Sequence, residues 1–167
     1  MRKALLALTV AVVGAALVIA PVSATPAQSK VSITKTAASA PQFSTLVSLL
    51  KQAKLAGTLS GKGPFTVFAP TNAAFNKLPK STLDAVANDP ALLKKVLLYH
   101  VVKGNVPAAK VVTLNGKSAK TLAGQTVKIQ IRGGKVFLNG KTQVTKTDIM
   151  ASNGVIHVIN NVLIPSS

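Results

Sequence analysis

The sequence contains no cysteine and no tryptophan, and its only acidic residues are three aspartates. Without cysteine the chain can form no disulfide, no thiolate metal site and no cysteine nucleophile. Three carboxylates and two histidines also leave little material for a metal site or for the paired carboxylates of a glycosidase. The chain is therefore poor in catalytic groups, and we expect neither a bound metal nor a cofactor.

The residues that are abundant are apolar and basic. Hydrophobic residues make up 48% of the 167 positions, which is enough for the core of one domain. The 20 lysines and arginines give a formal net charge of +17. Such a charge favours attraction to anionic partners.

The amino end has the layout of a secretory signal peptide. A basic head, Met1–Lys3, precedes an apolar run over residues 4–20, and Pro21 and small residues up to Ala24 follow. The alternative is a retained membrane anchor, but the run is at the lower edge of the length needed to span a bilayer. We expect residues 1–24 to be removed, which leaves no stable membrane span. The protein is then secreted, to the periplasm or the medium, with residues 25–40 as a flexible leader.

Helical patterns dominate the first half of the remaining chain. Apolar spacing predicts an amphipathic helix over residues 42–56, and a buried strand is expected over 64–69. Ser81 with Asp84 resembles a capping box. Asp89 followed by Pro90 is typical of a helix start, so a helix is expected over 91–98.

Strand patterns dominate the second half. Residues 126–132 alternate apolar and polar side chains, and glycine-containing turns lead to strands over 135–138 and 141–145. Residues 154–164 are almost continuously apolar, as in a strand covered on both faces. Helices that precede strands predict an α+β fold.

Three segments together resemble the signatures of the fasciclin-like domain family. They are Thr66–Phe75, Leu98–Val102 and Ala151–Pro165, and the resemblance covers residues 41–165. It implies a wedge of two packed β-sheets flanked by short helices, used as an extracellular adhesion or interaction module. The motif positions expected to be structural are Thr66, Phe68, Pro70, Thr71, Asn72, Phe75, Asn153, Gly154, His157 and Asn160.

The resemblance also bears on four individual residues. Family members often carry aspartate at the positions of Asn72 and Asn160, so contacts there are expected to be neutral amide hydrogen bonds. In animal relatives the region of Tyr99 and His100 is implicated in receptor contact, which makes both candidate binding residues. The alternative is that this pair fixes the turn between a helix and a strand.

Asp148, Ser152 and His157 provide the residue types of a nucleophilic triad. They lie within ten residues around a turn and a strand, without a nucleophile elbow. We interpret His157 as a neutral core histidine and Ser152 as a turn residue. The sequence therefore predicts a protein that is not an enzyme.

Basic residues gather on one predicted strand pair. Lys128, Arg132 and Lys135 are candidate binding residues, because alternation places them on one face. Specific nucleic-acid binding is not expected, since Arg132 is the only arginine beyond the signal peptide and few aromatic residues are free to stack on bases. Acidic polysaccharide, envelope polymer or lipid head groups are the anionic surfaces that remain. The alternative is that the lysines only keep the protein soluble.

Two functions follow from these patterns. The first is a secreted interaction module that binds a cell-surface or matrix protein, or an anionic polysaccharide or envelope polymer. The second is a carrier of an apolar small molecule, such as a pigment or lipid, held in a cleft between the helices and the sheet.

Overall fold

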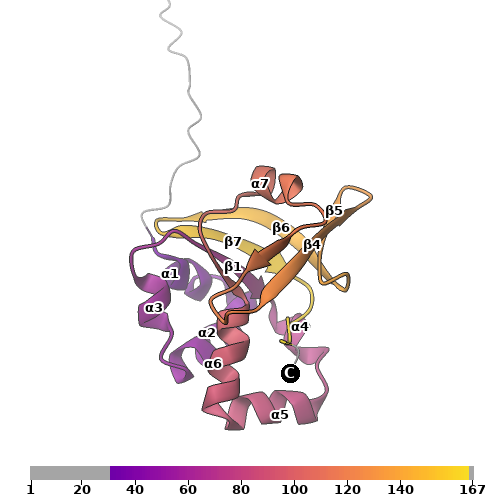
Figure 1. The fold of residues 1–167 in the computed structure, drawn as a ribbon. Coiled ribbons are helices and arrows are strands. Elements are labelled where there is room, and N and C mark those ends of the chain that lie inside the picture. Colours follow the sequence, from indigo (N-terminus) through magenta and orange to yellow (C-terminus); the bar gives the residue numbers. More distant parts are fainter. Residues whose placement is uncertain (1–30, 166–167) are drawn as a thin grey trace, which may run out of the picture.

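A computed structural model of the chain describes residues 31–165, which form one sheet with helices packed against it (Figure 1). The helices are α1 (Ile33–Ala38), η1 (Pro41–Phe43), α2 (Ser44–Gln52), α3 (Ala56–Ser60), α4 (Asn72–Asn76), α5 (Lys80–Asn88), α6 (Pro90–Tyr99) and α7 (Ala108–Thr113). The strands are β1 (Phe65–Pro70), β2 (Val101–Lys103), β3 (Ser118–Lys120), β4 (Thr126–Arg132), β5 (Lys135–Leu138), β6 (Thr142–Ala151) and β7 (Gly154–Ile159). The expected signal peptide lies outside the described residues.

The seven strands form a single sheet in the order β2-β1-β7-β6-β5-β4-β3. β1 and β7 run parallel and every other neighbouring pair is antiparallel. The sheet bends through the long strand β6, where the register to β7 shifts twice. Its two edges then meet again at a bridge between Val102 of β2 and Thr121 beside β3. The α+β fold is confirmed, and the two packed sheets are the halves of this one bent sheet.

Two apolar clusters fill the molecule. One lies between the helices and the outer face of β1 and β7, and includes Phe43, Leu93 and Ile156. The other lies inside the bend and includes Phe68, Ile129 and Leu138. β7 is buried at all six positions because it contacts both clusters, which confirms the strand covered on both faces over 154–159. The expected continuation over 160–164 is wrong, since these residues lie outside the strand.

Of the two predicted helix starts, the one at Asp89 is confirmed and the one at Ser81 is wrong. The Thr71 hydroxyl accepts a hydrogen bond from the Ala74 amide at the start of α4. Asp89 accepts from the amides of Ala91 and Leu92 at the start of α6. Ser81 caps nothing, because α5 already begins at Lys80.

The amino-terminal part of the domain departs from the sequence analysis. The leader predicted over residues 25–40 is wrong for 33–38, which form α1 with Ile33 only 1% exposed. The single helix expected over 42–56 is divided, because α2 ends at Gln52 and Lys54 adopts a left-handed conformation with φ of 56°. α3 then starts at Ala56. β4, by contrast, has the predicted bounds.

Candidate functional site

Three neighbouring strands hold the segment that connects β2 to α7. The Thr66 hydroxyl on β1 donates to the Gly104 carbonyl at 2.7 Å and accepts from the Val106 amide at 2.9 Å. His157 Nε2 on β7 donates to the Val106 carbonyl at 2.7 Å. An Asp148 carboxylate oxygen on β6 accepts from the amide of Ala108, the first residue of α7, at 2.8 Å. We call Thr66, His157 and Asp148 the clamp.

His157 is completely buried, as the sequence analysis proposed. Its ring stacks on Phe68 at a centroid distance of 5.7 Å. Burial lowers the pKa of His157, and the Val106 carbonyl and the charge of Asp148 oppose this only in part. Because Nε2 donates to a carbonyl, Nδ1 carries the lone pair, and it has no hydrogen-bond partner among the described residues.

The same geometry excludes the triad. His157 Nε2 is occupied by Val106, and its Nδ1 bonds neither Ser152 nor Asp148. Ser152 lies exposed in the turn between β6 and β7. Asp148 caps α7 and does not orient a base. The three residues therefore cannot act as nucleophile, base and orienting acid.

Tyr99 and His100 are inside the protein, only 4% and 2% exposed. The Tyr99 hydroxyl donates to the Thr126 carbonyl and accepts from the Asn139 amide. This pair was a candidate for receptor contact, and its burial corrects that expectation, since neither side chain reaches the surface. The two residues instead join the end of α6 to the sheet.

Both ring nitrogens of His100 are hydrogen-bonded. Nε2 accepts from the Leu163 amide at 2.9 Å, so the proton is on Nδ1, which donates to the Val96 carbonyl at 2.8 Å. Burial lowers the pKa of His100 to about 4, and the bond to Val96 opposes this shift. The residue is therefore neutral at ordinary pH and has no free lone pair for a metal.

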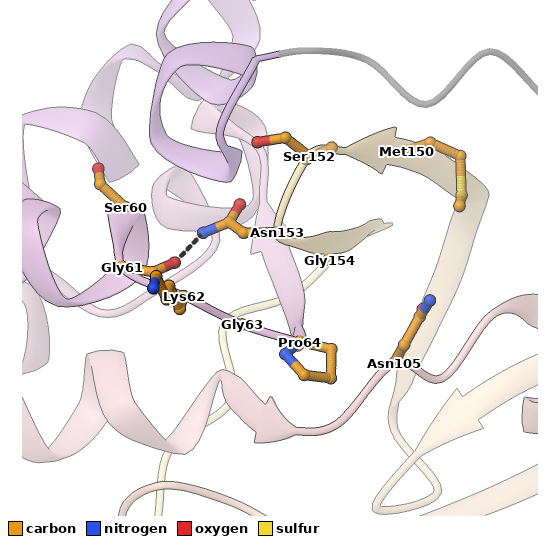
Figure 2. A pocket seen from close by; sticks show the side chains of 11 residues that line it. Ser60, Gly61, Lys62, Gly63, Pro64, Asn105, Met150, Ser152, Asn153 and Gly154 are labelled. Carbon is orange, nitrogen blue, oxygen red and sulfur yellow. Dashed lines mark hydrogen bonds between the residues drawn. The ribbon is translucent and has the colours of Figure 1, made fainter.

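The closing signature fixes a turn that lines an open hollow of about 530 Å³ (Figure 2). The Asn153 amide nitrogen donates to the carbonyls of Leu59 and Gly61, and its oxygen accepts from the Ile33 amide. A side chain at Gly154 would overlap the Phe65 carbonyl oxygen. The rim of the hollow carries Lys62 and Ser152 but no nucleophile with an adjacent base.

The two asparagines that replace a frequent family aspartate both make amide contacts. The Asn72 nitrogen donates to the Pro41 carbonyl and the Ser44 hydroxyl, which a carboxylate could not do. The Asn160 oxygen accepts from the Gln143 amide. The other motif residues Phe68, Pro70 and Phe75 are buried. The signature positions thus hold the fold together.

The candidate basic residues share the outer face of the bent sheet. In β4, Val127 and Ile129 point inward and are completely buried, while Lys128 and Arg132 are exposed. Arg132 pairs directly with the exposed Lys135 of β5. The structure adds Lys120, which lies opposite Thr126 on the same outer face. We call Lys120, Lys128, Arg132 and Lys135 the basic face.

Sequence reasoning missed Lys120 and the clamp for different reasons. β3 has only three residues, too few to show an alternating pattern. Thr66 lies 38 residues from Gly104 and His157 lies 51 from Val106, so no local pattern connects them. The resemblance marked Thr66 and His157 as structural, but it did not indicate their partner.

The structure offers little room for an apolar ligand between helices and sheet. The enclosed space lined by α2, α4, α5, α6 and residues 162–164 measures about 10 Å³, enough for one water at most. This volume does not favour the carrier alternative. Within residues 31–165, no cluster of histidine and acidic side chains is suited to bind a metal ion, and no helix has the length and apolar character to cross a bilayer.

Comparison with known proteins identifies the family of this chain. The model of the Fasciclin domain matches residues 41–165. The chain belongs to the fasciclin domain family. Protein sll1483 of Synechocystis sp. is 45% identical over 148 residues, which cover 87% of this chain and 80% of that protein.

Some fasciclin relatives are longer. Immunogenic protein MPB70 of Mycobacterium bovis is 37% identical over 75% of this chain and 64% of its own length. Transforming growth factor-beta-induced protein ig-h3 of Sus scrofa is 38% identical, but the match covers only 18% of that protein. A fasciclin domain pair from the insect cell adhesion molecule fasciclin I superposes with a TM-score of 0.67 at 19% identity, over 82% of this chain and 52% of that one. That likeness concerns the fold alone.

Proposed function

We propose that this fasciclin domain is a secreted, non-enzymatic interaction module that binds an anionic partner through its basic face. The observation that carries the proposal is the strand register, which brings Lys120, Lys128, Arg132 and Lys135 to one outer surface. Membership of the fasciclin domain family is consistent with an interaction role. The basic head and apolar run at the amino end support secretion.

The arrangement of charges supports a role in binding. Arg132 and Lys135 lie directly opposite each other across two strands, and like charges in that position destabilise a sheet. The guanidinium donates to Gln130 at 3.2 Å, on its own strand. A polyanion placed on this face would relieve the repulsion and release its own counterions. The charges of the basic face therefore favour binding of an anionic ligand and do not stabilise the sheet.

The basic face suits an extended anion rather than a small one. Its cations belong to three neighbouring strands, and Lys128 and Arg132 are four positions apart in β4, or roughly 13 Å along the strand. A single phosphate or carboxylate could contact the paired Arg132 and Lys135 but could not also reach Lys128. An acidic polysaccharide or envelope polymer carries repeated charges and can contact several together.

Binding to immobilised alginate across a salt series tests the proposal. Lys128→Gln/Arg132→Gln/Lys135→Gln should weaken binding at low salt by at least tenfold and flatten the salt dependence of the affinity. The matched control, Lys51→Gln/Lys94→Gln/Lys95→Gln, removes the same charge from exposed positions on α2 and α6. It should retain most of the affinity.

Equal losses in the two triple variants would overturn the proposal, because net charge alone would then explain binding. Absence of binding by the unaltered protein, even at low salt, would also contradict it. The solubility alternative predicts that second result.

A further inference from the structure

The bent sheet is almost closed, but a gap remains where its two edge strands face each other. β2 and β3 meet at the bridge between Val102 and Thr121, beside which the Leu122 amide donates to the Val101 carbonyl at 2.8 Å. Beyond the bridge the chain leaves β2 at Gly104, which adopts φ of 106°. The two edges diverge there.

A groove of about 600 Å³ occupies this gap. Its floor is the apolar cluster inside the bend, reached through Val102, Val106, Leu114 and Ala119. Its two sides carry the exposed lysines Lys103 and Lys120. The volume and apolar lining with a few polar groups are those of a binding site.

The backbone at the edge of β3 is directed into this groove. The Lys117 carbonyl accepts from Ile129 and the Thr121 amide donates to Gln125, so residues 117, 119 and 121 face β4. By the alternation of an antiparallel pair, the peptide groups of Ser118 and the amide of Lys120 point away from β4, toward the groove, whereas the Lys120 carbonyl faces Lys103 beside the bridge between Val102 and Thr121. An extended chain placed in the groove would find the backbone partners of an added strand.

We infer that the groove accepts an extended, acidic segment of a partner protein as an additional strand between β2 and β3. This inference rests on the proposed function, since it names one class of anionic partner for the surface that adjoins the basic face. In an added strand, alternate side chains point to opposite sides of the sheet. Those pointing inward contact Val106, Leu114 and Ala119, and those pointing outward lie between Lys103 and Lys120.

The two sides therefore specify a pattern of alternating apolar and acidic residues. A polysaccharide does not fit, because an apolar floor cannot bond sugar hydroxyls. A second copy of this chain does not fit either, since it holds 20 basic residues and only three acidic ones. Charge complementarity selects a foreign, acidic peptide.

Fluorescence anisotropy with a labelled heptapeptide of alternating glutamate and valine tests the inference. The unaltered protein should bind this peptide more tightly than a peptide of the same composition with its valines grouped together. Ser118→Pro removes the amide on the groove side and leaves the pairing with β4 intact, so affinity should fall about tenfold. Lys94→Gln/Lys95→Gln on α6 should bind as the unaltered protein does.

A charge-reversed variant keeps the test decisive if Ser118→Pro fails to fold. Lys103→Glu/Lys120→Glu should lose the glutamate–valine peptide and bind a peptide of alternating lysine and valine. Equal affinity for the alternating and grouped glutamate peptides would overturn the inference that the groove binds an added strand. Such a result, with alginate binding still dependent on the basic face, would leave the proposed function standing. Loss of alginate binding in both triple variants alike would instead contradict the proposed function.

Discussion

The clamp and the basic face lie on the same sheet but use their polar side chains in opposite ways. Thr66 and His157 are completely buried, and each bonds a backbone group of the 104–106 segment. Lys128, Arg132 and Lys135 are exposed, and two of them repel each other. The difference shows that the family signature maintains the fold, whereas the exposed cations lie outside the signature, on the surface where we propose that a partner binds.

Gly154→Ala should cause the largest loss of stability, because Gly154 belongs to the signature and lies very close to the backbone of a neighbouring strand. The added Cβ would overlap the Phe65 carbonyl oxygen and force β1 and β7 apart. We expect a loss of about 3 kcal/mol or more in the free energy of unfolding, measured by urea denaturation. Gly57→Ala is the matched control, since a Cβ there meets no atom within 4 Å. Similar stabilities for the two variants would contradict the structural role that we give to Gly154.

The buried histidines should make stability sensitive to acid. His100 has a pKa of about 4 in the folded protein and 6.5 when unfolded, so only the unfolded chain gains the proton between these values. The free energy of unfolding should therefore fall as pH drops from 6.5 toward 4, by about 1.4 kcal/mol per pH unit for this residue. The lowered pKa of His157 adds to the slope in the same direction.

Urea denaturation at several pH values measures this slope. His100→Gln keeps a donor and an acceptor near Val96 and Leu163 but cannot titrate. The slope between pH 6.5 and 4 should decrease by about 1.4 kcal/mol per pH unit, and the part that remains is due to His157. An unchanged slope would show that His100 does not control the response.

Thr66→Val tests the clamp with a smaller change. The substitution keeps the shape of the side chain but leaves the Gly104 carbonyl and the Val106 amide without their hydroxyl partner. We expect a loss of about 2 kcal/mol in unfolding free energy. Thr126→Val, at an exposed position of β4, should change stability far less. Equal effects would mean that the clamp contributes little.

The basic face should have the smallest effect on stability. Lys128→Gln/Arg132→Gln/Lys135→Gln should shift the unfolding free energy by less than about 0.5 kcal/mol, because these side chains are exposed and far from any core contact. A slight gain is expected from removal of the repulsion between β4 and β5. A large loss would show that the lysines serve the fold and would weaken the contrast with the clamp.

The fold class and most strands could be predicted from the sequence, because each strand has its own local pattern of apolar and polar residues. β4 alternates over seven residues, and β7 is apolar apart from His157, so both could be recognised without their partners. α1 was missed because its only buried side chains are Ile33 and Ala37, which make too weak a pattern. The break after α2 depends on the left-handed conformation of Lys54, which could not be predicted because lysine has no preference for positive φ.

The candidate site was only partly predictable. Alternation was sufficient to group Lys128 with Arg132, and the Gly133-Gly134 turn brought in Lys135. Burial of Tyr99 and His100 could not be predicted, because it depends on Asn139 and Leu163, which are 40 and 63 residues away. The groove between β2 and β3 depends on closure of the whole sheet.

The most direct test measures stability and alginate affinity together in Thr66→Val and in Lys128→Gln/Arg132→Gln/Lys135→Gln. We predict opposite outcomes. The clamp variant should lose stability and, under conditions where it remains folded, bind alginate as the unaltered protein does. The basic-face variant should keep its stability and lose affinity. If the folded clamp variant lost affinity while the basic-face variant retained it, the signature would be the binding site and our account would be wrong.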